Sequence, residues 1–164
     1  MISTADLCDM HSGLLATGEL RILHGTWRWF SEARSLCGQI MTLEARGCNA
    51  ELRDLLAQPG HARVLIIDAG NDSGALLGDN LAKEALRNGW GGVFVNGNVR
   101  DCSALASIAL PVLAMGSWPQ RSKNQRGGGV GAPLTIGGAP ISPGDWIYAD
   151  EDGVVVSKSE LKSG

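Results

Sequence analysis

Three short apolar runs lie along the middle of the chain, and a glycine follows each of them within two residues. They are residues 63–68 (RVLIID), 92–95 (GVFV) and 112–115 (VLAM). A continuous apolar run bounded by turn residues is typical of a strand buried on both faces of a parallel sheet. We therefore predict three central strands here, and residues 35–43 (SLCGQIMTL) predict another strand before them.

Apolar residues at helical spacing fill the segments between and before these strands. The expected helices are residues 4–15, 49–57, 78–88 and 103–108. Thr4 and Asn49 are the expected N-caps of the first two, because their side-chain oxygens can accept hydrogen bonds from free backbone N–H groups. Gly89 stands where a C′ glycine ends a helix. Strands that alternate with helices of this length predict parallel βαβ units.

The last third of the chain has a different pattern. After a polar, glycine-rich loop at residues 117–131, short apolar segments alternate with turn residues. The expected hairpins pair residues 134–136 with 139–141 around Gly137 and Gly138, and residues 146–148 with 154–157 around residues 150–153. The whole pattern predicts one α/β domain, residues 1–164, with a parallel βαβ core and C-terminal antiparallel hairpins.

Composition narrows the class of protein. The chain has 164 residues, of which 44% are hydrophobic and 19% charged, and these values fit one globular domain rather than a disordered chain. Its formal net charge of −3 argues against direct binding of nucleic acid, which usually needs a basic face. The four cysteines form no C-x-x-C pair, so they do not support a zinc ribbon or a thioredoxin-like site.

Two features predict a cytoplasmic protein that does not enter a membrane. The first residues include Asp6 and Asp9 but no basic stretch, unlike those of a signal peptide. The longest mostly apolar run, residues 104–115, contains Ser107 and Pro111 and is too short to cross a bilayer.

The common nucleotide-binding and hydrolase motifs do not occur in this sequence. The glycines at positions 70, 74 and 78 do not have G-x-G-x-x-G spacing, and the chain contains no Walker A loop, H-E-x-x-H or G-x-S-x-G. His11, His24 and His61 are scattered without metal-ligand spacing. The candidate chemistry therefore has to come from other residues.

One candidate is the segment Gly78, Asp79, Asn80 and Leu81 (GDNL), which opens a predicted helix. Free backbone N–H groups and the helix dipole make such a place a binding site for an anion such as a carboxylate. The alternative is purely structural, with Asp79 acting as an ordinary N-cap.

A second candidate is the pair Arg100 and Asp101, which follows the predicted strand ending in GVFVNGNV. Ligands of open α/β sheets bind beyond the carboxyl ends of strands, so this pair and the GDNL segment are expected to face one crevice. Arg100 offers a planar fork for a carboxylate or enolate oxygen, and Asp101 offers hard oxygens for Mg²⁺ or Mn²⁺. The alternative is an exposed ion pair of little energetic value.

Five segments along nearly the whole chain carry a family resemblance. They are TADLCD, VLIIDAG, ALLGDNLAKEALRNGWGGVFVNGNVRDCSAL, LPVLAMGSWP and PISPGDWIYADEDGVVVS. In this order they resemble the family of the regulator of ribonuclease activity A (RraA), which includes class II 4-hydroxy-4-methyl-2-oxoglutarate aldolases that also decarboxylate oxaloacetate. The resemblance implies a compact swivelling β/β/α domain that forms homotrimers, with substrate at the subunit interface and a metal ion held by few protein ligands.

The resemblance also implies roles for individual residues. Gly78, Asp79, Asn80 and Leu81 would bind the substrate carboxylate through backbone N–H groups. Arg100 would contact the keto or enolate oxygen, Asp101 would hold the divalent cation, and Asp79 would position a water that shuttles a proton. The expected function is then a metal-dependent lyase acting on short 2-oxo acids, by retro-aldol cleavage to pyruvate or by decarboxylation of oxaloacetate.

The sequence departs from the family pattern at one position that bears on the metal. The aldolases have an acidic residue three positions after the aspartate of the Arg-Asp pair, where this chain has Ala104.

The alternative function is a protein-binding regulator that inhibits an endoribonuclease of the RNase E type, since a net charge of −3 suits docking on basic segments. Methyl transfer to a quinone is disfavoured, because no G-x-G-x-G loop for adenosylmethionine follows the first buried strand.

Overall fold

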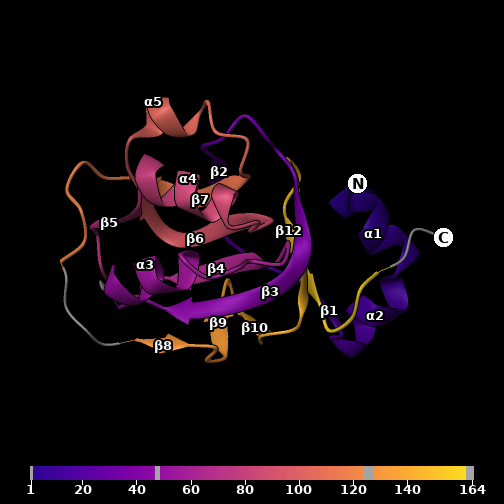
Figure 1. Ribbon diagram of the computed structural model, residues 1–164. Helices are drawn as coiled ribbons and strands as arrows, with labels where there is room; N and C mark the ends of the chain where they lie inside the picture. The colour runs from indigo at the N-terminus through magenta and orange to yellow at the C-terminus, as the bar shows by residue number, and fades with distance from the viewer. Residues whose placement is uncertain (1, 47–48, 124–127, 162–164) are drawn as a thin grey trace.

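Within residues 2–46, 49–123 and 128–161, which the computed structural model describes, a sheet of ten strands runs through the molecule (Figure 1). Its parallel centre has the order β3 (Leu36–Glu44), β4 (Val64–Asp68), β6 (Gly92–Val99) and β7 (Val112–Ser117). The other members are β1 (Leu20–Ile22), β2 (Arg28–Trp29), β5 (Ala75–Leu77), β8 (Gly129–Val130), β11 (Trp146–Ala149) and β12 (Val154–Ser157).

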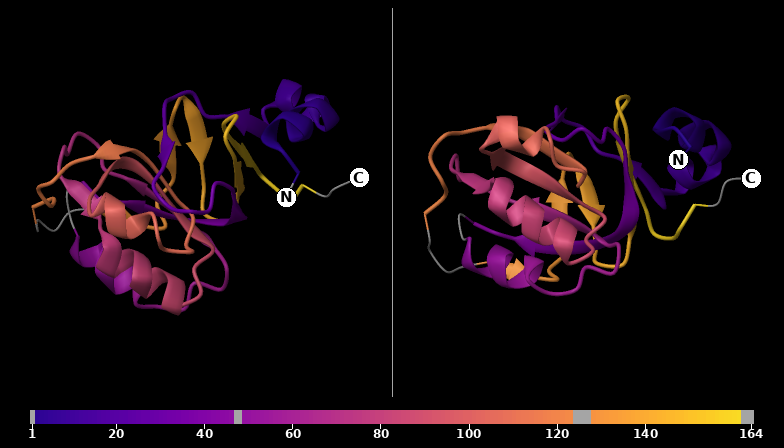
Figure 2. Two further views of the ribbon diagram at one scale, coloured as in Figure 1. Left: turned by 90° about the horizontal axis from the view of Figure 1, so that it is seen from above. Right: turned by 45° about the horizontal axis from the view of Figure 1, so that its top comes forward.

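The helices α3, α4 and α5 lie on one side of the central strands and the β9–β10 hairpin on the other (Figure 2). The helices are α1 (Thr4–Met10), α2 (Ser12–Thr17), α3 (Ala50–Leu56), α4 (Asp79–Arg87) and α5 (Cys102–Leu105), and the hairpin strands are β9 (Leu134–Ile136) and β10 (Ala139–Ile141). Along β4, Leu65 and Ile67 pack in the cluster under α3 and α4, whereas Val64 and Ile66 pack toward the hairpin. The central strands are thus buried on both faces, as their continuous apolar runs predict.

The C-terminal hairpins form as predicted, and the second of them, β11–β12, also extends the main sheet. β9 pairs antiparallel with β10 across Gly137 and Gly138, which both have positive φ. β11 pairs with β12 and also lies antiparallel to the first half of β3. The helices α1 and α2 lie at the far end of the molecule, where Leu7 and Leu20 pack against Tyr148 of β11 and Val155 of β12 (Figure 1).

Several local predictions were wrong. Residues 4–15 form two helices that meet at His11, and the N-cap of the first is Ser3, whose Oγ accepts from the backbone N–H of Asp6. Thr4 instead donates through both its backbone N–H and its hydroxyl to the carboxylate of Asp150. The helix predicted at residues 103–108 is the single turn α5, and the short strands β1, β2, β5 and β8 were not predicted.

The two helices over the sheet begin and end close to their predicted bounds. Asn49 occupies the N-cap position of α3, but its backbone is helical and its side chain makes no capping hydrogen bond, so its predicted capping role was wrong. Gly89 follows the C-cap Asn88 of α4 with φ +73°, which confirms the predicted C′ glycine.

The short strand β5 brings the two candidate clusters together. It runs parallel to the end of β6, with Leu77 opposite Val99, and the backbone N–H of Arg100 donates to the Leu77 carbonyl at 2.9 Å. Gly78 and Arg100 therefore leave neighbouring strands at the same edge of the sheet. No helix among the described residues is long and apolar enough to span a membrane.

Candidate active site

A cavity of about 220 Å³ opens where β5 and β6 end. All six residues proposed from the sequence to bind substrate or metal line it: Gly78, Asp79, Asn80, Leu81, Arg100 and Asp101. The cavity is smaller than the roughly 300–1,000 Å³ of pockets for drug-sized ligands, so it suits a small metabolite. The sequence predicts that the GDNL segment and the Arg100–Asp101 pair face one crevice at the strand ends. Their shared place in this cavity confirms the prediction.

The start of α4 presents backbone donors to the cavity that have no partner within the helix backbone. Gly78 is its N-cap, in extended backbone, and the first backbone hydrogen bond of the helix runs from the Ala82 N–H to the Gly78 carbonyl at 3.1 Å. The N–H groups of the preceding helical residues have no partner within the helix. Asp79 is the first helical residue and Gly78 is the N-cap, so the alternative that Asp79 caps this helix was wrong. Backbone N–H groups and the helix dipole at such a start favour a negatively charged group.

Asp101 and Gly78 are in close contact. A Cβ atom at Gly78 would come within 2.5 Å of Asp101 Oδ2, a distance that real Cβ contacts do not reach. Asp101 itself has φ +58°, a left-handed conformation that is uncommon for residues other than glycine. The glycine and the strained aspartate together place the Asp101 carboxylate beside the start of α4.

Arg100 and Asp101 interact only weakly with one another. Arg100 Nε lies 3.6 Å from Asp101 Oδ2, and the two side chains remain 40% and 44% exposed. An exposed pair of this kind contributes about 0–1 kcal/mol to stability. Both charged groups therefore remain accessible to a ligand in the cavity.

Asp79 is tied to the next turn of its own helix. Lys83 Nζ donates to Asp79 Oδ2 at 2.6 Å. This hydrogen bond is the main cause that holds the pKa of the Asp79 carboxyl below its usual value, and the Lys83 charge and the backbone N–H of Asn80 act in the same direction. The carboxylate is thus kept ionised and can accept a hydrogen bond from a water or a substrate hydroxyl.

The donor set fits a divalent cation that keeps much of its water shell. Among the described residues no group of three His, Cys, Asp or Glu side chains is placed to hold a metal ion. The Asp101 carboxylate, however, accepts no hydrogen bond from any described side chain or backbone group, so its hard oxygens are available. Mg²⁺ is commonly bound by one or two carboxylates, with waters and substrate oxygens completing its shell.

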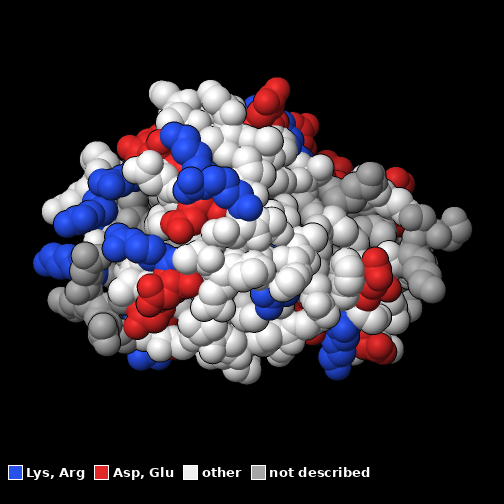
Figure 3. Space-filling view, in the orientation of Figure 1, with Lys and Arg blue, Asp and Glu red and all other residues white. Residues whose placement is uncertain are grey.

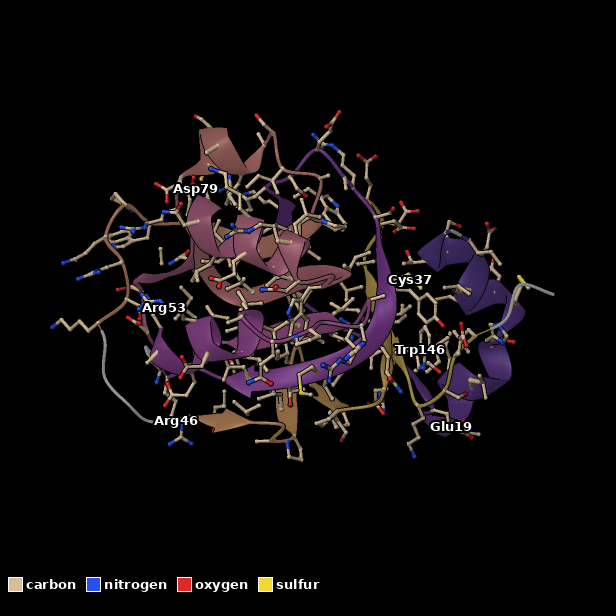
Figure 4. The ribbon with its side chains drawn as sticks, in the orientation of Figure 1. Glu19, Cys37, Arg46, Arg53, Asp79 and Trp146 are labelled. Carbon is tan, nitrogen blue, oxygen red and sulfur yellow. The ribbon has the colours of Figure 1, made fainter. Side chains whose placement is uncertain are left out.

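Four further polar residues that line the cavity were not identified as site residues from the sequence: Asn49, Arg53, Glu84 and Arg121. Arg121 lies in the segment predicted only as a glycine-rich loop, and it is held beside β5 by a bridge to Ala75. Figure 4 shows Arg53 on α3 and Asp79 on α4 at the same end of the molecule. The i, i+4 spacing of Asn49 and Arg53 could have placed both on one face of a helix, but no sequence signal shows what that face meets.

Charged side chains of both signs gather around this end of the molecule. Arg53, Arg100 and Arg121 line the cavity together with Asp79, Glu84 and Asp101. Figure 3 shows Lys and Arg side chains clustered beside Asp and Glu side chains at the end of the molecule where Figure 1 places β5. Ala104 follows Asp101 by one turn, its N–H donating to the Asp101 carbonyl at 2.9 Å, but Ala104 does not line the cavity.

Comparison with known proteins gives consistent results over nearly the whole chain. A family model described as RraA-like, Aldolase/RraA, matches residues 4–156. A Burkholderia mallei protein named "Putative 4-hydroxy-4-methyl-2-oxoglutarate aldolase" is 46% identical over 163 residues, covering 98% of both chains.

Two solved structures share the fold. The RNA-processing inhibitor RraA of Thermus thermophilis has a TM-score of 0.90 at 32% identity, covering 99% of this chain and 96% of its own. A Geobacillus kaustophilus protein described as an S-adenosylmethionine: 2-dimethylmenaquinone methyltransferase has a TM-score of 0.89 at 34% identity, covering 99% of this chain and 100% of its own.

Proposed function

The chain belongs to the RraA-like family, and from this premise we propose that it is a divalent-metal-dependent lyase that acts on short 2-oxo acids. The observation that carries the proposal is the meeting of three groups in one small cavity. These are the N–H groups at the start of α4 that the helix backbone leaves unpaired, the guanidinium of Arg100 and the carboxylate of Asp101. The proposed reactions are cleavage of 4-hydroxy-4-methyl-2-oxoglutarate to pyruvate and decarboxylation of oxaloacetate.

Both reactions meet the same chemical problem, because each one builds negative charge on the enolate of pyruvate. The N–H groups of residues 79–81 would bind the C1 carboxylate of the substrate. The Arg100 guanidinium would then donate to the C2 oxygen, where the charge develops. A donor that is fixed in place before the reaction stabilises this charge without having to reorganise.

Asp101 would hold the cation. When bound, Mg²⁺ or Mn²⁺ at this carboxylate supplies positive charge that lowers the energy of the enolate. The close packing of Asp101 on Gly78 keeps the carboxylate near the N–H groups that bind the substrate. This mechanism needs no lysine to form a Schiff base with the substrate, and no lysine lines the cavity among the described residues.

Asp79 would carry out the proton transfer through a water. Its lowered pKa keeps the carboxylate ionised, and Lys83 occupies Oδ2 while leaving Oδ1 for the water. In the aldol cleavage this water would accept the proton of the C4 hydroxyl as the C3–C4 bond breaks. It would return a proton to C3 of the enolate, and pyruvate would then leave.

We propose that the active form is a homotrimer whose neighbouring subunit completes the cavity. Trp118 is 46% exposed, and its backbone N–H donates to the Val99 carbonyl, directly beside the strand end that leads into Arg100. Exposed Trp and Met side chains are enriched at interfaces, and Met115 is also exposed. A monomer mass in light scattering at micromolar concentration would contradict this assembly.

A second candidate function is inhibition of an endoribonuclease of the RNase E type. The observation that favours it is the similarity to the Thermus thermophilis protein, which is described as an RNA-processing inhibitor. The net charge of −3 suits docking on a basic segment of such a partner. This activity would need no divalent cation at Asp101.

The test is turnover by the purified protein. Pyruvate release from oxaloacetate and from 4-hydroxy-4-methyl-2-oxoglutarate is measured with Mg²⁺, with Mn²⁺ and after chelation. The proposal predicts cleavage that is lost on chelation and restored by added cation. If neither substrate is consumed faster than in buffer with the same cation, while an RNase E-type enzyme is inhibited in the presence of chelator, the second candidate replaces the first.

A further inference from the structure

The cavity has a second wall that the proposed reaction does not yet use. This wall comes from α3, where Asn49 and Arg53 lie one helical turn apart and both line the cavity. Leu52, Leu55 and Leu56 of the same helix are buried in the core below. The polar face of α3 is thus directed to the same cavity as the start of α4.

Arg53 is an arginine without a partner in the described part of the chain. No hydrogen bond or ion pair of its guanidinium is formed there, although Glu84 lines the same cavity. A guanidinium presents a planar fork that matches a carboxylate in two parallel hydrogen bonds. Arg53 is therefore available for an anionic group that enters from solvent.

Asn49 adds an independent observation. Its side chain is almost fully enclosed, with 8% of the residue exposed, and its Oδ1 atom has no hydrogen-bond partner among the residues that the structure describes. A buried acceptor that is left unpaired costs about 1–3 kcal/mol, and most such groups have a partner in native proteins. Asn49 lines the cavity, so a rotation of its amide would turn this unpaired oxygen toward a ligand, whose hydroxyl group can then donate to it.

We infer that Asn49 and Arg53 form a second subsite that selects 2-oxo acids with a carboxylate and a hydroxyl at the far carbon. This inference rests on the proposed function. The start of α4 binds the C1 carboxylate, so the C4 end of a short substrate points into the rest of the cavity. There Arg53 binds the second carboxylate, and Asn49 Oδ1 accepts from the C4 hydroxyl.

The subsite makes different demands on the two reactions. In aldol cleavage the second carboxylate stays a carboxylate and leaves as part of the other product, so its contact with Arg53 persists through the reaction. In decarboxylation of oxaloacetate the far carboxylate becomes CO₂ and loses its charge, so a cation that binds it gives no help in the transition state. The subsite therefore serves the aldol substrate and not the decarboxylation.

The test uses a matched pair of aldol substrates that differ only in the far carboxylate, 4-hydroxy-4-methyl-2-oxoglutarate and 4-hydroxy-2-oxopentanoate. Arg53→Met is expected to lower kcat/KM for the first by about 10- to 100-fold, the value of a charge-assisted bidentate contact. It should change kcat/KM for the second, and kcat for oxaloacetate, less than about twofold. Asn49→Ala should lower kcat/KM for both aldol substrates, because both carry the C4 hydroxyl.

Two control variants test whether Arg53, and not another arginine, binds the second carboxylate. Arg87→Met removes the same charge from α4 outside the cavity and should leave all three reactions unchanged. Arg121→Met removes the other unused arginine of the cavity. If Arg121→Met lowers kcat/KM selectively for the dicarboxylate and Arg53→Met does not, the subsite is assigned to the wrong residue.

Binding without turnover separates this inference from the proposed function. Calorimetry with Mg²⁺ compares 2-oxoglutarate with 2-oxopentanoate, which lacks the second carboxylate. A wild-type preference for 2-oxoglutarate that Arg53→Met removes supports the subsite even if no substrate is cleaved, in which case only the lyase function fails. Equal binding of the two acids by the wild type, or an equal loss of both in Arg53→Met, overturns the subsite even if the lyase function holds.

Discussion

The Asp101 carboxylate packs so closely on Gly78 that a Cβ atom there would lie 2.5 Å from Asp101 Oδ2. The atom that this Cβ would meet is the end of the Asp101 side chain and not a backbone atom, so it can move away. Gly78→Ala is therefore expected to fold, but with Asp101 displaced from the start of α4. We predict at least a tenfold weaker Mn²⁺ affinity, measured by electron paramagnetic resonance, as is typical when a group that orients a ligand is disturbed.

The matched control is Gly13→Ala, since a Cβ at this glycine of α2 meets no atom within 4 Å. It should bind Mn²⁺ like the wild type. Unchanged Mn²⁺ affinity in Gly78→Ala would show that the contact with Gly78 does not position Asp101.

Arg100→Lys tests the proposed oxyanion donor. Lysine keeps the positive charge but loses the planar fork. Loss of one oriented donor to a developing oxyanion typically costs on the order of 10²–10³ in kcat. Steady-state kinetics with oxaloacetate measure this loss. A decrease of only a few fold would indicate that Arg100 and Asp101 form a surface ion pair without a catalytic role.

Lys83→Met tests how Asp79 is kept ionised. The pKa of Asp79 is lowered chiefly by the hydrogen bond from Lys83, so removing Lys83 should raise this pKa toward its usual value. Since the mechanism requires ionised Asp79, the acid limb of the kcat/KM profile should move to higher pH, while the rate at neutral pH changes little. The pH profile measures this shift. If the acid limb stays at the wild-type pH, the group whose ionisation limits kcat/KM is not Asp79.

Ala104→Glu tests the departure from the family pattern. Position 104 lies one turn after Asp101 and is only partly exposed. A carboxylate there could accept hydrogen bonds from water around the cation, an effect that commonly tunes metal affinity by about 10–100-fold. We predict tighter Mg²⁺ binding and a larger gain in aldol cleavage than in decarboxylation. Identical metal titrations of both activities in the two proteins would show that this position does not affect the site.

The sequence predicts the central fold because its strongest patterns are local. The runs that form β4, β6 and β7 are continuously apolar, and burial on both faces requires this. β5 was missed because it has only three residues, Ala75–Leu77, and is held by its pairing with β6. Its existence depends on tertiary contacts that no short window of sequence contains.

The residues of the candidate site likewise fall into two groups, those with a local sequence signal and those placed only by tertiary packing. The GDNL segment could be found because it opens a predicted helix, and the Arg100–Asp101 pair because it follows a predicted strand. Asn49 was predicted as an N-cap, but its helical backbone leaves its side chain free to enter the cavity wall. The role of Arg53 depends on how α3 packs beside α4, which is a property of the whole fold.

The central claim is that Asp101 holds the cation on which turnover depends. Asp101→Asn removes one charge from an exposed side chain, so its melting temperature should remain close to that of the wild type. The measurement is the rate of oxaloacetate decarboxylation as a function of Mg²⁺ concentration in the two proteins. We predict a saturable, Mg²⁺-dependent rate in the wild type and no rate above that of Mg²⁺ in buffer for the variant. A folded Asp101→Asn protein with the wild-type rate and Mg²⁺ dependence would contradict the account.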